Sequence, residues 1–263
     1  MKKYAIVYRA VLMETLQYAA NVMMGFISYF IIIFVLIRLW NYMYREPGSL
    51  IAGYTREQMI WYVIITETLW FGARPSVMAR QTASDIRSGN IAYQVNKPYY
   101  YPLYILSRFT GEWSIQLPMY AAFATLAGVL MVGTLADFGI GTFLAALPCI
   151  VLGITINGVF KLNISLISFW IDDSTPFQWL YDKLILVVGT IFPIEIFPAA
   201  LQPLFKLTPI YTVCYGPAKL LVDFSAEKCL EILIAQTLYL AAGCVLMSFI
   251  YEKGVKKLYV NGG

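Results

Sequence analysis

Five polar residues stand inside apolar stretches of the sequence, where a buried charge is costly in a bilayer and usually faces a cavity or a partner. They are Glu67, Asn157, Lys161, Asn163 and Glu195. Lys161 and Asn157 are four residues apart, so they share one face of a helix. We therefore take Glu67, Asn157, Lys161 and Glu195 as candidates for lining a polar pathway. The alternative is that Lys161 extends its amine to the membrane surface and Glu67 pairs with a neighbouring helix.

The sequence shows no signature of catalysis or of metal binding. It contains no histidine, which excludes a histidine proton relay or metal site. It has no GxxxxGK[ST] motif, so a P-loop for ATP is absent, and it has no GxSxG or HExxH motif. The cysteines form no CxxC pair, so a zinc site is not expected. Cys214 and Cys229 are either free thiols, which is the favoured interpretation, or a disulfide.

The composition is that of an integral membrane protein. Hydrophobic residues make up 60% of the 263 residues and charged residues 13%, with a mean hydropathy of +0.67. An ordinary soluble domain carries about a quarter charged residues. The Lys and Arg residues are spread along the chain rather than clustered, so lipid and not nucleic acid is the expected contact.

The apolar segments predict an all-α membrane protein that forms a single transmembrane domain over residues 1–263. The six expected transmembrane helices are residues 21–40, 59–79, 103–132, 140–171, 184–197 and 229–251. The fifth is expected to stop early, because prolines follow it at once. Residues 41–58 and 172–183 are expected to be polar loops.

Two segments outside these spans have patterns of their own. Residues 1–18 place their polar side chains within an arc of about 140° of a helix, which predicts an amphipathic helix lying in the membrane interface. Residues 193–217 contain five prolines, a density that forbids a continuous helix. Because the segment stays apolar, we expect it to form short re-entrant helices in the outer leaflet.

Six spans place both termini on one side of the membrane. Lys and Arg are about twice as frequent on that side, which favours cytosolic termini in a multi-pass plasma-membrane protein. Residues 80–102 then form the longest polar interval and face the cytosol. Within it, Asp85 to Gly89 is typical of the end of a short helix capped by glycine.

This interval resembles the cytosolic loop of type-2 ABC exporter permeases. The residues that carry the resemblance are IRSGNIAY at 86–93 and NKP at 96–98. The amphipathic first helix, the six spans, the proline-rich stretch before the last helix and the ending Asn261-Gly262-Gly263 are also similar to that family. The resemblance covers essentially the whole chain, and the order of these features carries it more than any one motif.

The resemblance implies a permease that is not itself catalytic and is driven by a separate dimeric ABC ATP-binding subunit, on which ATP and Mg would bind. The implied ATPase-coupling residues are Asp85, Ile86, Arg87, Ser88, Gly89, Asn90, Lys97 and Pro98. The implied outer gate is formed by Pro193, Pro198, Pro203 and Pro209. A second permease, a different paralogous chain or a copy of this one, would complete the pathway in a bacterial-type cell membrane. The implied cargo is an apolar or amphipathic compound, such as a drug, peptide or lipid.

Two other functions stay open. A secondary transporter or channel without a motor is motivated by Glu67 and Lys161, although no internal repeat supports it. A membrane scaffold that transports nothing is the second alternative.

Overall fold

The computed structural model describes residues 2–46, 48–135 and 138–261. The elements in chain order are α1 (Lys2–Gln17), α2 (Ala19–Met43), α3 (Arg56–Ala73), α4 (Pro75–Arg87), α5 (Ile91–Val95), α6 (Tyr101–Met131), α7 (Ile140–Leu166), η1 (Ile167–Phe169), α8 (Thr175–Val187), η2 (Ile194–Ile196), α9 (Gln202–Lys206), η3 (Tyr211–Tyr215), α10 (Gly216–Val222) and α11 (Ala226–Asn261). The described residues form helices and no strand. Gly262 and Gly263 of the C-terminal motif lie outside them.

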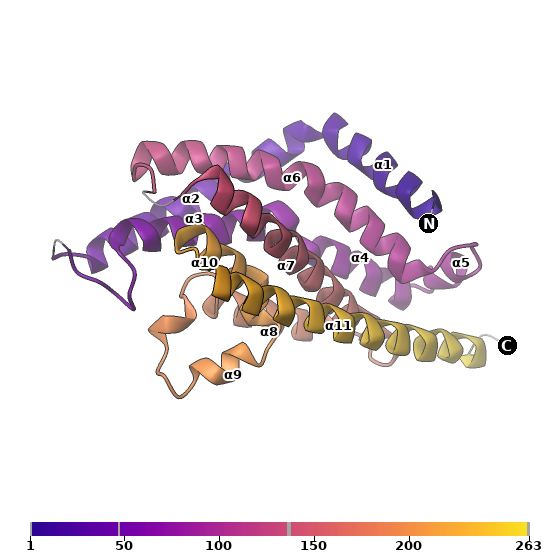
Figure 1. Cartoon of the computed structure of the whole chain (residues 1–263). Coiled ribbons are helices and arrows are strands. Elements are labelled where there is room, and N and C mark those ends of the chain that lie inside the picture. The colour runs from indigo at the N-terminus through magenta and orange to yellow at the C-terminus, as the bar shows by residue number, and fades with distance from the viewer. Residues whose placement is uncertain (1, 47, 136–137, 262–263) are drawn as a thin grey trace.

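The helices form an elongated bundle with two distinct ends (Figure 1). The start of α1, the short α5 and the end of α11 lie together at one end, called here the termini end. The end of α2, the start of α3 and the end of α6 lie at the opposite end, called the far end. Within the bundle α7 packs against α11, α4 and α10, while α6 packs against α1 and α3.

Four helices are long and apolar enough to cross a membrane, among the described residues. They are α2, α6, α7 with η1, and α11. The chain is therefore a multi-pass, all-helical membrane protein. Two of the six predicted spans lack such a helix. α3 has 18 residues but includes Arg56, Glu57 and Glu67, and the region of the fifth span is divided into short helices.

The second predicted span, residues 59–79, is wrong as a single helix. α3 begins earlier, at Arg56, because Thr55 and Gln58 form a capping box, with the Gln58 N–H donating to the Thr55 hydroxyl at 3.2 Å. α3 ends at Ala73, Arg74 takes a left-handed conformation with φ 46°, and Pro75 begins α4. The break follows from Pro75, which disfavours helical geometry in the residue before it.

The polar loop predicted over residues 172–183 is also wrong from Thr175 onward, because α8 starts there. Within this region Ser174 and Gln178 are buried, at 0% and 4% exposure, whereas Asp172, Asp173 and Lys183 are exposed. Phe177 and Trp179 are also exposed, at 52% and 61%. α8 therefore turns some polar side chains into the bundle and some large apolar ones outward, and it ends at Val187, inside the span predicted over residues 184–197.

The central position of α7 depends on close packing. Gly158 lies against the ring of Phe109 on α6, and a Cβ at that position would be 2.6 Å from the ring. Small residues let helix backbones approach closely in membranes, where packing rather than hydrophobicity drives association. Half of the residues in the most apolar stretch of α7 are accordingly buried. α7 contacts α4, α8 and α11.

Candidate functional site

The turn between α4 and α5, at the termini end, carries several of the residues predicted to contact an ATPase. Ser88, Gly89 and Asn90 are exposed. Gly89 has φ +79°, which glycine adopts without steric cost, and its N–H donates to the Ile86 carbonyl at 3.2 Å. Ile86 is 6% exposed, so it anchors the turn in the core instead of presenting a side chain to a partner.

Asp85 and Arg87 connect this turn to other segments. Asp85 Oδ2 accepts a hydrogen bond from the Tyr101 hydroxyl at 3.1 Å. Arg87 Nη1 lies 4.0 Å from Asp173 Oδ1, and both side chains are more than half exposed. Hydrogen bonds from Thr175, and more weakly the charge of Arg87, hold the pKa of Asp173 below its ordinary value. The turn is thus linked to α6 and to the start of α8.

The start of α1 lies beside the same segment. Lys3 Nζ donates to the Pro98 carbonyl, and the Tyr100 N–H donates to the Tyr4 hydroxyl at 2.9 Å. Lys97 and Pro98 are exposed. The first helix and residues 88–98 therefore form one continuous surface at the termini end.

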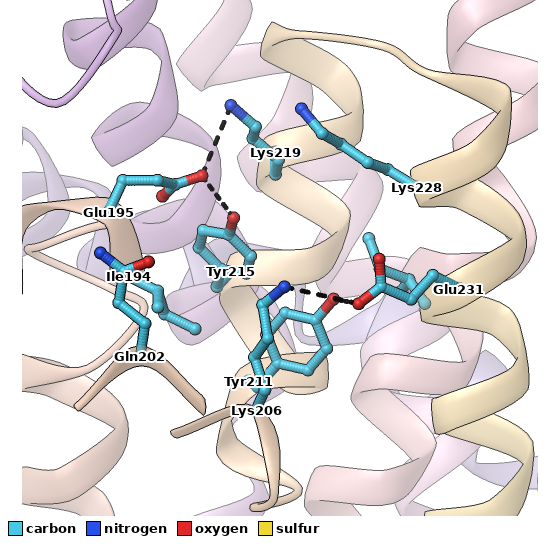
Figure 2. Close-up of a pocket in the computed structure, with 10 residues that line it drawn as sticks. Ile194, Glu195, Gln202, Lys206, Tyr211, Tyr215, Lys219, Lys228 and Glu231 are labelled. Atoms are coloured by element: carbon cyan, nitrogen blue, oxygen red, sulfur yellow. Dashed lines mark hydrogen bonds and ion pairs between the residues drawn. The ribbon is translucent and has the colours of Figure 1, made fainter. Parts of the chain in front are cut away.

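A polar pocket of about 120 Å³ lies between the proline-rich segment and the start of α11. These elements lie away from the termini end of the bundle (Figure 1). Figure 2 shows side chains from η2, α9, η3, α10 and α11 converging on it. Its charged side chains are Glu195, Lys206, Lys219, Lys228 and Glu231.

Lys219 is the most buried charge of this pocket, with 7% exposure. Its Nζ lies 2.8 Å from Asp223 Oδ2 and 3.6 Å from Glu195 Oε1, and 4.2 Å from the centre of the Tyr54 ring. The Tyr215 hydroxyl donates to Glu195 Oε1 at 2.6 Å. One ammonium group therefore joins η2, α10 and the segment before α3.

A second, more open pair lies across the pocket. Lys206 Nζ is 3.5 Å from Glu231 Oε1, with both side chains about half exposed, and the Tyr211 hydroxyl is also 3.5 Å from that oxygen. Cations and carboxylates occur in nearly equal number, so the pocket has little net charge. Chemically, such a lining can hydrogen-bond a polar group that is uncharged or zwitterionic.

The prolines named as an outer gate shape the backbone around this pocket but do not line it. Pro193 precedes η2, Pro203 lies in α9, and Pro209 precedes the π-helical turn η3. Pro198 follows the residue that caps the end of η2, Phe197. In the same region Cys214 is buried, and both it and Cys229 carry free thiols.

The four pathway candidates do not share one cavity. Among them, and within the described residues, Glu195 alone lines the polar pocket. Glu67 and Asn157 are 2% and 5% exposed. Lys161 is wholly buried, and its Nζ lies 2.7 Å from Asp182 Oδ1 on α8. The idea that Lys161 extends its amine to the membrane surface is therefore wrong.

Sequence reasoning missed several residues that complete these clusters. Asp182 was assigned to a loop, although its spacing of four from Gln178 places both on one helix face. No local sequence pattern pairs Lys219 with Glu195, which is distant in sequence. Tyr215 carries no sequence signal, because tyrosine is frequent throughout the chain.

A family model described as "ABC-2 family transporter protein" matches residues 11–262. The chain belongs to the ABC-2 transporter family. The match covers nearly the whole chain and agrees with the resemblance drawn from residues 86–98. No match was found among curated proteins. For a membrane component of an ABC transporter, an ATP-binding subunit is the implied partner.

Proposed function

We propose that this ABC-2 family protein is the permease subunit of an ATP-driven exporter. It forms the translocation pathway with a second permease and is driven by a separate dimer of ATP-binding subunits, which hold ATP and Mg. The observation that carries the proposal is the exposed α4–α5 turn with the start of α1 beside it. A rigid turn of this kind, anchored by Ile86, is suited to receive force from a soluble partner.

The proposed topology has six membrane crossings and both termini in the cytosol of a bacterial-type cell. α2, α6, α7 and α11 supply four crossings. α3 supplies another, and the segment from α8 to α10 supplies the sixth together with a re-entrant outer gate at Pro193, Pro198, Pro203 and Pro209. α8 alone is too short, because its 13 residues span about 20 Å.

The proposed cargo is an apolar or amphipathic compound, such as a drug, a peptide or a lipid. The low net charge of the polar pocket supports this class. A different paralogous chain is the favoured second permease, and a copy of this chain is the other choice.

The first test is purification of the tagged chain in mild detergent and in lipid nanodiscs, with mass spectrometry of what accompanies it. We expect an ABC ATPase with a P-loop. Its absence under both conditions would overturn the proposal.

Arg87→Glu tests the coupling turn directly. Placing like charge at a docking contact costs several kcal/mol, so we expect transport-linked ATP hydrolysis of the reconstituted complex to fall by about tenfold or more. The matched control is Arg56→Glu at the far end, since Arg56 is also about half exposed beside a carboxylate. Equal activity of the two variants would count against coupling through the turn.

A motor-free secondary transporter is the second candidate, because Glu67 is a carboxylate buried within α3. Under that function a proton gradient would drive transport by the purified chain without an ATPase. Glu67→Gln would abolish it. Transport that requires ATP and survives Glu67→Gln would exclude this candidate.

A further inference from the structure

A second hollow lies at the break between α3 and α4, away from the polar pocket and from the α4–α5 turn. Its volume is about 280 Å³. Two arginines and a serine, Arg74, Arg80 and Ser76, line one part of it, and Trp70, Phe71 and Val77 line another. The hollow therefore combines positive charge with an apolar wall.

The two arginines differ from most other cations that lie within the bundle. Lys161, Lys206 and Lys219 each have a carboxylate within 4.0 Å. Within the described part of the chain, neither Arg74 nor Arg80 forms such an ion pair. Two positive charges facing one hollow, with no carboxylate among its lining residues, favour an anionic ligand.

Two hydrogen bonds within the protein orient the guanidinium group of Arg74 before any ligand binds. Its Nε donates to the Phe71 carbonyl at 3.1 Å and its Nη2 donates to the Tyr120 hydroxyl at 2.8 Å. A guanidinium group has five N–H donors, so donors remain for a ligand. Such a held, planar donor group suits the oxygens of a phosphate.

One carboxylate reaches the edge of the hollow and is already neutralised. Ser76 Oγ donates to Asp182 Oδ2 at 3.2 Å, and Asp182 Oδ1 is 2.7 Å from Lys161 Nζ. Asp182 therefore does not cancel the charge of the two arginines.

The position of the hollow along the bundle indicates the kind of anion. α3 has 18 residues and is about 27 Å long, close to the hydrocarbon thickness of about 30 Å. If α3 crosses from the outer side, Arg74 lies at the level of the inner headgroups. Trp70 lies one turn before it, and Val77 is 49% exposed, so an acyl or other apolar chain could cover both.

We propose that this hollow binds the phosphate headgroup of an anionic amphiphile from the inner leaflet. Arg74 and Arg80 contact the phosphate, and Trp70, Phe71 and Val77 contact the apolar part. The inference rests on the proposed export function and narrows its cargo from any amphipathic compound to a phosphate-bearing one. The same chemistry could come from a transported amphiphile or from a resident phospholipid, and the experiments below separate these sources.

The first experiment measures lipid binding to the purified full-length chain by native mass spectrometry in an uncharged detergent. The probes are dioleoylphosphatidylglycerol and, for comparison, zwitterionic dioleoylphosphatidylcholine. We expect the first to bind at least about tenfold more tightly. Equal binding of the two lipids would overturn the proposal.

Arg80→Gln is the decisive variant, because Arg80 is exposed and its loss leaves the α3–α4 break intact. It should weaken phosphatidylglycerol binding by about tenfold, and Arg74→Gln should add to that loss. The control is Arg108→Gln near the start of α6, which also removes one positive charge but does not line the hollow. A loss with Arg108→Gln equal to that with Arg80→Gln would mean unspecific attraction and would overturn the site.

Inorganic phosphate separates an amphiphile site from a site for a free anion. We expect millimolar phosphate not to displace phosphatidylglycerol, because it lacks the apolar part. Displacement would overturn the assignment to an amphiphile.

The role as cargo is tested in proteoliposomes that contain the accompanying ATPase. ATP should transfer labelled phosphatidylglycerol between the two leaflets, and Arg80→Gln should remove the transfer together with binding. Binding to the site without ATP-dependent transfer would overturn the cargo role and identify a resident phospholipid. Because lipid binding is measured on the isolated chain, failure of the site is distinguishable from absence of an ATPase partner.

Discussion

Two buried lysines of this permease are neutralised in different ways. Lys161 on α7 is wholly buried and has one carboxylate partner, Asp182, at 2.7 Å. Lys219 on α10 is nearly as buried but is shared between Asp223 and Glu195. The carboxylates of the second cluster are also more exposed, with side-chain exposures of 29% for Glu195 and 45% for Asp223 against 23% for Asp182.

The difference indicates which part of the molecule can rearrange. A single buried pair cannot exchange partners without leaving a charge unpaired in a region of low dielectric constant. Lys219 can lose Glu195 and keep Asp223, with water reaching both carboxylates. We therefore expect the α7–α8 contact to stay fixed and η2 to separate from α10 at the lower cost of the two. That is the property an outer gate needs.

The largest expected effect is on stability, from breaking the ion pair between Lys161 and Asp182. Lys161→Met should lower the free energy of unfolding by about 3 kcal/mol, because Asp182, whose side chain is only 23% exposed, is left without its counter-charge. The double variant Lys161→Met with Asp182→Leu should recover most of that loss. Thermal unfolding in detergent measures both, and Lys228→Met, an exposed lysine of the polar pocket, is the control. A double variant as unstable as the single one would contradict this account.

A smaller effect is expected for the shared cluster. Glu195→Gln should cost about 1 kcal/mol or less, because Lys219 keeps the shorter pair with Asp223 and Glu195, at 3.6 Å and 29% exposed, is partly screened by water. Chemical cross-linking between cysteines placed on η2 and α10 should show faster opening in this variant. A loss as large as that of Lys161→Met would erase the proposed difference between the two regions.

The smallest expected effect is on how the free energy of unfolding depends on pH. A hydrogen bond from Lys219 holds the pKa of Asp223 below its ordinary value. The stabilisation is therefore present above the unfolded pKa of about 4 and is lost as the pH falls through the lower folded value. We expect at most about 1 kcal/mol, because the Asp223 side chain is 45% exposed and water screens the pair. Asp223→Asn should remove this part of the acid sensitivity, and an unchanged pH profile would show that the pair contributes nothing.

The sequence predicted the membrane class, the long helices and the family, because these depend on composition and on the order of segments. It also predicted the helix end at Gly89. It failed at α8, where Gln178 and Asp182 were read as a loop although they face the bundle. In a soluble protein the apolar residues of a helix face the core. In an apolar environment a helix such as α8 can instead turn polar residues toward the bundle. The partners of Lys161 and Lys219 could not be found, since ion pairs between distant segments leave no local periodicity.

The break between α3 and α4 has a mechanical consequence. Arg74 takes a left-handed conformation that costs a residue with a side chain about 1–2 kcal/mol. Its Nε bonds the Phe71 carbonyl, the group that Pro75 leaves without a donor. Arg74 and Pro75 therefore form the whole break between α3 and α4, because Arg74 also supplies the hydrogen bond that Pro75 removes. A force applied to α4 would therefore not be carried along α3 as along one straight rod. We expect it to pass through the side contacts of α4 instead, such as Ser76 to Asp182 on α8, and through its packing against α7.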